Sequence, residues 1–213
     1  ANVTFPYSNG VTGAQAMQST EELKPNASRG FNTMNGGTVP ASTFDPLIGT
    51  GSSSAPWWGG SVVISSDVPD SIVGIGNTLW YAEEKSAQFG LAGANESANA
   101  LYFPLMQRSG GSWSNWSAAL IQNLSTSNAA SVNLYFYDRS GNLDLTLPNE
   151  IIQPSSGRGF NTKTGGTVDA SKFAPLGNDW YGSLYVTSNQ PVIGSAQMIF
   201  GNDSSAYNAM IAP

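Results

Sequence analysis

Residues Arg29–Leu47 read RGFNTMNGGTVPASTFDPL, and residues Arg158–Leu176 read RGFNTKTGGTVDASKFAPL. Fourteen of the nineteen positions are identical, and the two stretches start 129 residues apart. Chance does not produce such a match, so one structural unit occurs twice in the chain. This duplication sets how the rest of the sequence is divided.

The similarity continues on both sides of this motif. Three further pairs of segments correspond: Leu101–Pro104 (LYFP) with Met210–Pro213 (MIAP), Val132–Gly141 with Val3–Gly10, and Trp180–Ser188 with Trp58–Ser66. We predict a first repeat in residues 1–92, a small and polar linker in residues 93–100, and a second, complete repeat in residues 101–213. The first repeat starts late, because it has no counterpart of Trp113–Leu124.

Hydrophobic residues alternate with polar ones, and helical periodicity is almost absent. Val132–Asp138 and the leucines of 143–147 flank the turn-like residues 139–142, which predicts a β-hairpin. Ser183–Ser188 and Val192–Phe200 flank Asn189-Gln-Pro191 and predict a second hairpin. With about seven short strands in a full unit, the sequence predicts an all-β fold: two tandem sandwich units of the Ig-like or jelly-roll type, the first lacking its opening strand.

The repeated motif itself is typical of a structured crossover loop between strands. We expect its glycines to adopt positive φ in both copies: Gly30, Gly36 and Gly37 in the first, and Gly159, Gly165 and Gly166 in the second.

Composition excludes several classes of partner. Only 10% of the residues are charged, the net charge is −6 and the pI is near 4.4, so no basic cluster is present for nucleic acid or an anionic membrane. No apolar run is long enough to predict a membrane span. Cysteine is absent, which excludes disulfides and thiolate metal sites.

Several features favour an exported protein. The chain begins at Ala1 rather than Met, which we interpret as removal of a signal peptide or release from a longer precursor, and we expect a secreted, extracellular or cell-surface location. Six Asn-x-Ser/Thr sequons are candidates for covalent glycans: Asn2, Asn26, Asn95, Asn115, Asn123 and Asn202. Asn26, Asn95 and Asn202 stand in loop-like sequence and are the better candidates.

Nothing in the sequence favours catalysis. Histidine and cysteine are both absent, which removes most nucleophile–base pairs. The carboxylate pairs Glu21-Glu22 and Glu83-Glu84 lack a counterpart in the second repeat and are interpreted as exposed acidic loops. We therefore expect no enzyme activity and no cofactor.

The segment Asp138–Asp144 has two interpretations. Asp138, Asn142 and Asp144 occupy positions 1, 5 and 7 of a calcium loop, but position 12 is Asn149 where an EF-hand has glutamate. A hairpin turn is the favoured interpretation, with calcium binding as the alternative.

Several residues are candidates for contacts with other molecules, because we expect their side chains to be exposed or because the repeat duplicates them. Trp57 and Trp58 are candidates for an assembly contact or a sugar-stacking surface, and Trp57 stands in an insertion of the first repeat. Arg29, equivalent to Arg158, is interpreted as a loop-stabilising residue or a contact between subunits. Three residues near the C-terminal end are further assembly candidates: Tyr207, Met210 and Ile211.

The order of motifs in the second repeat resembles a known kind of protein. Tyr102–Met106, a Gly/Ser stretch, Trp113–Asn123 and Val132–Gly141 are similar to the tandem repeats of large secreted surface and filament proteins of environmental bacteria. The resemblance implies β-sandwich beads in a stalk, sheath or extracellular filament.

Two functions follow as expectations. The first is a structural subunit of an extracellular filament or cell-surface layer, a homopolymer that assembles head to tail, with a segment near a terminus such as Ser205–Pro213 completing the next subunit by strand addition. The alternative is a carbohydrate-binding or adhesion module.

Overall fold

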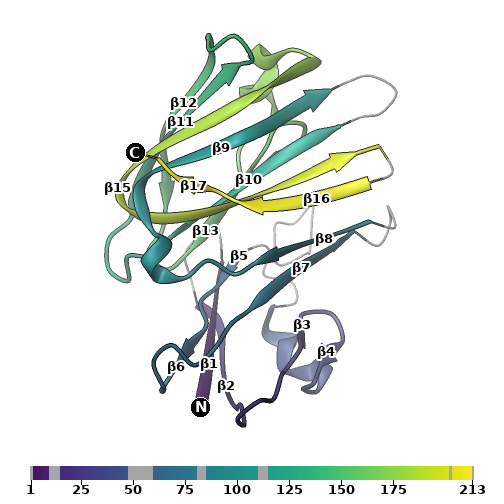
Figure 1. Cartoon of the computed structure of the whole chain (residues 1–213), viewed down its shortest axis with the longest axis vertical. Coiled ribbons are helices and arrows are strands. Elements are labelled where there is room, and N and C mark those ends of the chain that lie inside the picture. Colours follow the sequence, from purple (N-terminus) through teal and green to yellow (C-terminus); the bar gives the residue numbers. More distant parts are fainter. Residues whose placement is uncertain are drawn as a thin grey trace.

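The computed structural model describes residues 2–9, 15–47, 60–80, 85–109, 115–201 and 203–212. These residues form an all-β protein, and Figure 1 shows strands β1–β8 in one lobe and β9–β17 in the other. Short 3₁₀ helices lie between some of the strands: η1 (Ala41–Leu47), η3 (Ala94–Glu96) and η4 (Ala170–Leu176). The predicted all-β class is confirmed.

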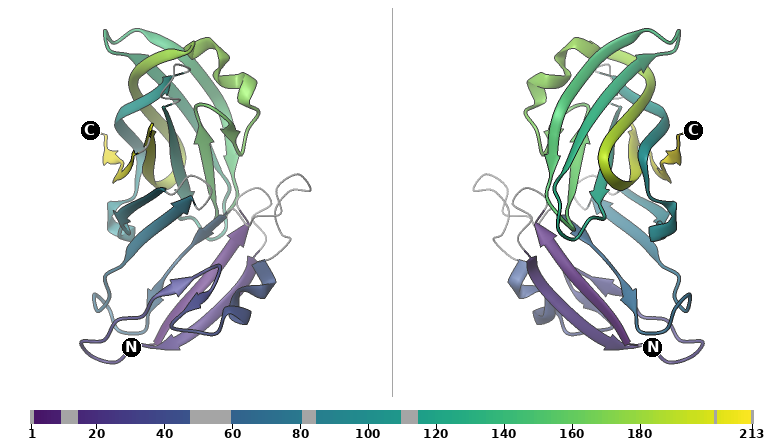
Figure 2. Two further views of the ribbon diagram at one scale, coloured as in Figure 1. Left: turned by 90° about the vertical axis from the view of Figure 1, so that its right-hand side faces the viewer. Right: turned by 90° about the vertical axis from the view of Figure 1, so that its left-hand side faces the viewer.

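The second repeat forms one curled antiparallel sheet of nine strands. Its strands are β9 (Ala98–Ser109), β10 (Trp116–Asn123), β11 (Ala130–Asp138), β12 (Leu143–Ile152), β13 (Gly157–Asn161), β14 (Gly165–Gly166), β15 (Asp179–Phe200), β16 (Asp203–Asn208) and β17 (Met210–Ile211). The hydrogen-bonded order is β12-β11-β15-β9-β10-β13-β14, with β16 also beside β15 and β17 beside β9. Figure 2 shows how the sheet curls around its own interior.

One strand, β15, runs through both halves of this sheet. Its first half pairs with β11 and β9, and its second half pairs with β10 and β16. The predicted hairpin around Asn189-Gln-Pro191 is therefore wrong. None of these three residues has the positive φ of the common two-residue hairpin turns, and the halves of β15 before and after them pair with other strands rather than with each other, with an irregularity in the pairing to β9 between Thr187 and Val192.

The hairpin predicted around residues 139–142 is confirmed as β11–β12. Gly141 has a φ of 85°, and the backbone N–H of Asp138 donates to the carbonyl of Asn142 at 2.9 Å. Along β11 the alternation places Val132, Leu134 and Phe136 in the core with no exposed surface.

The core of the second repeat lies between the two halves of the curled sheet. The ring of Phe136 makes edge contacts with Phe173, at 5.8 Å between centroids, and with Trp180, at 5.9 Å. Burying a side chain of this size contributes about 1.5–3 kcal/mol. Further core residues come from strands across the sheet: Leu101, Phe103, Met106, Ile121, Phe160, Leu184, Val186 and Val192.

The repeated motif forms a short β-turn-β unit followed by a 3₁₀ helix. Gly165 and Gly166 have φ values of 84° and 72°, and a Cβ on either would overlap a backbone carbonyl. Gly36 and Gly37 repeat this conformation in the first copy. Positive φ at Gly30 and Gly159 was predicted and is wrong. The carbonyl of Gly159 instead accepts hydrogen bonds from the N–H and the hydroxyl of Thr167.

The first repeat reproduces several ladders of the second in the same register. Its strands are β1 (Asn2–Asn9), β2 (Gln15–Glu22), β3 (Phe31–Asn32), β4 (Gly36–Gly37), β5 (Gly60–Val62), β6 (Ser65–Ser66), β7 (Ile75–Trp80) and β8 (Lys85–Gly90). The pair Tyr7↔Val62 corresponds to Phe136↔Leu184, and Phe31↔Gly37 corresponds to Phe160↔Gly166. Strands β7 and β8 pair as the second half of β15 pairs with β16.

The two repeats touch through hydrogen bonds between β8 and β16 and at the start of β5. Ser204 donates to the carbonyl of Ser86, and Asn208 donates to the carbonyl of Gly90 at 3.1 Å. The hydroxyl of Ser61 donates to the carbonyl of Ser155 at 3.2 Å. Within the predicted linker of residues 93–100, η3 forms and β9 already begins at Ala98.

Candidate assembly site

Two strands of the second repeat have no counterpart in the described part of the first. In the second repeat, β9 lies beside the first half of β15, and β10 lies between the second half of β15 and β13. In the described residues of the first repeat, β5 and β6 pair with β1 alone, and β7 pairs with β8 alone. The sequence predicted that the first repeat lacks an equivalent of β10. The described residues of the first repeat contain no equivalent of β9 either.

The strands of the first repeat are also more fragmented, and a turn at Val68–Ser71, with Asp70 at a φ of 52°, separates β6 from β7. Where the second repeat has the single strand β15, the first has the three short pieces β5, β6 and β7. Strand β13 spans five residues beside β10, whereas its equivalent β3 spans two. Pro6 stands where β11 has Tyr135, and it has no N–H to donate between β5 and β6.

The core of the first repeat is correspondingly open. Phe160, Leu184, Val186 and Val192 have no exposed surface in the second repeat. Their four equivalents in the first repeat are only half-buried: Phe31, Val62, Ile64 and Ile72. Among the described side chains, Val39 and Phe44, the second of which lies in η1, are the buried hydrophobic residues of this cluster. An apolar strip beside β5 and β6 is thus left incompletely covered.

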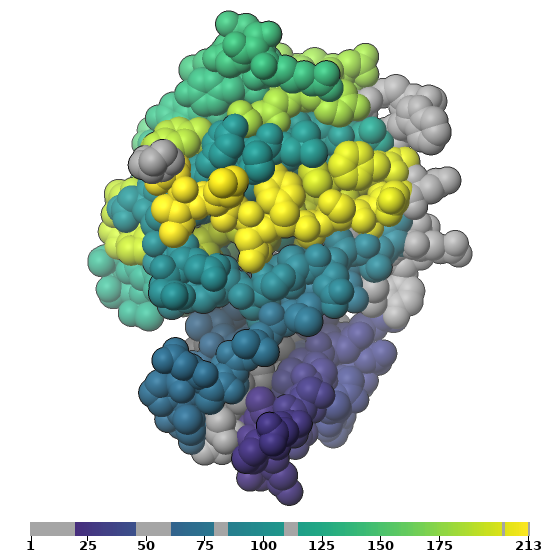
Figure 3. Space-filling view, in the orientation of Figure 1, coloured from purple at the N-terminus to yellow at the C-terminus, as the bar shows by residue number. Residues whose placement is uncertain are grey.

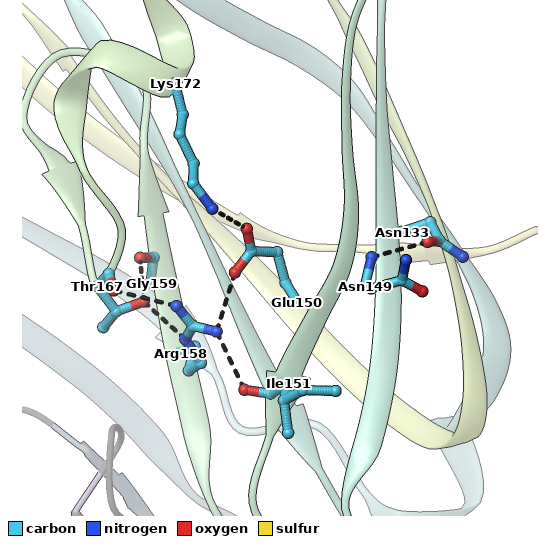
Figure 4. A network of polar contacts seen from close by, with 8 residues as sticks. All are labelled: Asn133, Asn149, Glu150, Ile151, Arg158, Gly159, Thr167 and Lys172. Carbon is cyan, nitrogen blue, oxygen red and sulfur yellow. Dashed lines mark hydrogen bonds and ion pairs between the residues drawn. The ribbon is translucent and has the colours of Figure 1, made fainter.

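A network of charged groups joins the repeated motif of the second repeat, Arg158–Leu176, to β12, as Figure 4 shows. The carboxylate of Glu150, 7% exposed, accepts hydrogen bonds from Arg158 at 3.1 Å and from Lys172 at 2.5 Å. Arg158 also donates to Thr167 and to the carbonyl of Ile151. The network ties β12 to β13 and η4.

The first repeat keeps a weaker version of this network. Arg29 lies 3.6 Å from the carboxylate of Glu21, and both side chains are about one-third exposed. Glu21 stands at the position of Glu150, so the interpretation of Glu21 as an acidic loop residue without a counterpart was wrong. Extending the alignment eight positions upstream of the two arginines would have found the pair.

The C-terminal segment lies at the surface, where Figure 3 shows it crossing the molecule between β9 and β8. Strand β17 holds two residues, paired as Met210↔Tyr102 and Ile211↔Leu101. Met210 and Ile211 are 57% and 54% exposed. Upstream, the hydroxyl of Tyr207 donates to the carbonyl of Leu105 at 2.6 Å, and burial raises the pKa of Tyr207 to about 12.

A row of aromatic side chains crosses the outer face beside β17. Tyr135, Tyr185 and Tyr102 lie opposite one another on β11, β15 and β9, and Met210 lies opposite Tyr102. Tyr102 and Tyr185 line a shallow apolar depression together with β17 and Ala212. No sequence pattern announced this row, because the three strands are distant in the chain.

The calcium candidates are engaged in other contacts. Asp138 accepts hydrogen bonds from the backbone of Ser140 and from the backbone and side chain of Asn142, and these bonds, the Asn142 side chain foremost, lower the pKa of Asp138. Asp144 accepts the indole N–H of Trp180 at 2.8 Å. In the described residues no group of three or more acidic side chains forms a metal cluster.

The sequons differ in their environment. Asn26 and Asn95 are exposed, and Asn115 accepts the backbone N–H of Gly201. Asn123 is fully buried and its amide donates to the carbonyls of Asn128 and Ile152, so the folded protein has no room for a glycan on that nitrogen. Asn2 lies in β1, and Asn202 falls outside the described residues.

The tryptophans are only partly described. Trp180 is buried in the core. Trp57, Trp58, Trp113 and the pair Glu83-Glu84 lie outside the described residues.

Comparison with known proteins adds no assignment. A scan against protein-family models, a search of curated proteins and a search of solved structures each returned no match. Among the described residues, no helix has the length and apolar character needed to cross a membrane.

Proposed function

We propose that this chain is a structural subunit of an extracellular filament or cell-surface layer. It consists of two tandem sandwich units, the first incomplete, and it assembles head to tail with copies of itself. The observation that carries the proposal is the contrast between the repeats: the same core positions are closed in the second and half-open in the first. A sheet edge with an adjacent apolar strip is a template for strand addition.

The geometry favours open polymers over closed pairs. The incomplete edge lies in the first repeat, and the exposed C-terminal strand lies in the second. A contact between two different surfaces is heterologous and propagates into a fibre unless it closes into a ring. Such a protein works by binding itself, and it is exported to the surface where the polymer forms.

The test is the assembly state of the purified chain. Light scattering across a concentration series and negative-stain electron microscopy should show open polymers that grow with concentration. A chain that stays monomeric at all concentrations, or that forms only closed shells, contradicts the proposal.

The tyrosine row supports a second candidate, a carbohydrate-binding or adhesion module, because aromatic faces pack on sugar rings. This function predicts saturable binding on a glycan array that is lost in Tyr185→Ala. Tyr181→Ala is the matched control, since Tyr181 lies outside the row and contacts Arg139. Equal binding by both variants would reject the row as the site.

A further inference from the structure

We propose that Met210–Ala212 of one copy of this chain adds to the first repeat of a second copy, alongside Val62–Ile64, as the equivalent of β9. This inference rests on the proposed function and names the donor, the acceptor and their register. The missing counterpart of β10 alone does not explain why a segment similar to LYFP should be the donor. The missing counterpart of β9 does, because LYFP belongs to β9.

The acceptor is defined by the second repeat. There Leu101–Phe103 of β9 pair with Leu184–Val186 of β15 and cover the core. Val62–Ile64 stand at the same positions of the first repeat as Leu184–Val186, and in the described residues no strand lies on that side of them. The first repeat therefore lacks the strand that LYFP supplies to the second.

The donor is defined by the sequence repeat. Met210–Pro213 (MIAP) is the counterpart of Leu101–Pro104 (LYFP), the segment that fills this position in the second repeat. In the isolated chain the donor is held by a two-residue ladder and one further hydrogen bond, from Ala212 N–H to the carbonyl of Ala100. Its two large side chains remain more than half exposed, so little burial is lost when it leaves.

The register follows from the ladder between β15 and β9. Val186↔Leu101, Tyr185↔Tyr102 and Leu184↔Phe103 become Ile64↔Met210, Val63↔Ile211 and Val62↔Ala212. Met210 then enters the core as Leu101 does, at 1% exposure, while Ile211 points outward like Tyr102. The alternation of a strand thus assigns opposite environments to two adjacent residues.

The sizes of the side chains are complementary at this position. In the second repeat the ring of Phe103 lies over Gly194, and a Cβ there would come within 2.7 Å of it. In the first repeat Leu91 lies over Gly74, the equivalent glycine. Leu91 corresponds to Ala209. Over this glycine the second repeat combines the large Phe103 with the small Ala209. The first repeat would combine the large Leu91 with the small Ala212 of the donor.

The anchor of the donor limits its reach. Tyr207, Asn208 and Ala209 are bonded to Leu105, Gly90 and Gly194 of their own chain, so the segment that can move begins at Met210. At the acceptor, Ser61 is buried against Ser155 of the second repeat, so the added strand runs alongside Val62–Ile64. Both limits leave three described residues, Met210–Ala212, and they require direct contact between successive subunits.

The first experiment compares two charge substitutions by light scattering and electron microscopy. Met210→Asp places a carboxylate in the acceptor core and should abolish polymers, while the monomer stays folded because Met210 is exposed there. Ile211→Asp is the matched control and should still polymerise, because Ile211 faces solvent in both states. Equal loss in both variants, or polymers in both, would overturn the assigned register.

The second experiment uses the absence of cysteine from the chain. Two single variants of different tag mass, Val63→Cys and Ile211→Cys, are mixed and oxidised. A heterodimer is expected, because directly opposite residues in a ladder have Cβ atoms close enough for a disulfide. Val63→Cys mixed with Met210→Cys is the off-register control and should give at least tenfold less product.

The outcomes separate this inference from the proposed function. Filaments without the heterodimer leave the structural function standing and overturn the C-terminal donor. The heterodimer without filaments supports the donor and refutes the filament. If filaments and heterodimer are both absent, both proposals fail.

Discussion

Glu150 shows how one buried charge organises the crossover motif. Its carboxylate joins Arg158 and Lys172, and Arg158 in turn holds Thr167 and lies 5.4 Å from the ring of Phe160. The equivalent pair Glu21–Arg29 is longer and more exposed. We therefore expect the loss of the glutamate to lower stability more in the second repeat than in the first. Removing one partner of a buried charge pair leaves the other charge buried without compensation.

Glu150→Ala should lower the free energy of unfolding by about 3 kcal/mol, because it leaves Arg158 buried without its partner. Glu21→Ala, the matched control, should cost below about 1 kcal/mol, as expected of an exposed pair. Urea unfolding of both variants gives the comparison. Similar losses for the two would show that burial of Glu150 adds nothing.

Tyr207 predicts a dependence of stability on alkaline pH. Burial raises its pKa to about 12 in the folded chain, whereas an unfolded tyrosine ionises near pH 10. The unfolded state loses its proton first, so the contribution of Tyr207 is complete below about pH 10 and is lost as the pH rises towards 12. Unfolding of wild type and Tyr207→Phe between pH 8 and 12 should show a steeper decline in the wild type, because only the wild type loses the contribution of Tyr207.

Among the elements, β15 and its counterparts β5, β6 and β7 show that strand continuity depends on neighbours. The matched sequences form one long strand where β9 and β10 flank them, and three short pieces where no described strand does. Each ladder supplies backbone hydrogen bonds that would otherwise go to water, and β9 and β10 also cover side chains. An added strand should therefore lengthen the pieces of the first repeat.

Amide hydrogen exchange should report this change. In the unassembled chain, Val62–Ser65 should exchange faster than the matched Leu184–Thr187, because Val62 and Ser65 pair with β1 alone and Val63 and Ile64 pair with no described strand. Polymerisation should slow exchange in Val62–Ser65 and leave Leu184–Thr187 unchanged. Unaltered exchange in the first repeat of a polymer would mean that the added strand lies elsewhere.

The molecule as a whole combines a closed unit with an open one. Among the side chains that the structure describes, four core positions closed in the second repeat are only half-buried in the first: Phe31, Val62, Ile64 and Ile72. The described contacts between the repeats include hydrogen bonds such as Ser61–Ser155 and Asn208–Gly90. We therefore expect the second repeat to be the more stable of the two.

A fragment of residues 93–213 should therefore fold alone, with a cooperative urea transition close to the main transition of the full chain. A fragment of residues 1–92 should unfold at lower urea, because four of its core positions stay half-exposed. Circular dichroism during urea titration measures both. A first fragment as stable as the second would show that its core is closed.

The repeat, the all-β class, the β11–β12 hairpin and the paired glycines were all readable from the sequence. Each depends on information in the linear sequence: alternation along a strand, turn residues between strands, and identity at a fixed offset of 129 residues. The same offset places Glu21 at the position of Glu150. Such signals can be detected without knowing which segments of the folded chain lie side by side.

The tertiary structure decided which distant segments meet. It made β15 continuous where Asn189-Gln-Pro191 predicted a turn, it buried Asn123 within a sequon, and it aligned Tyr135, Tyr185 and Tyr102 in one row. It also showed that the equivalents of both β9 and β10 are missing from the described first repeat. Ladders and cores join residues far apart in the chain, so local pattern cannot assign their partners, and the open edge of the first repeat emerged only by comparison with the closed second one.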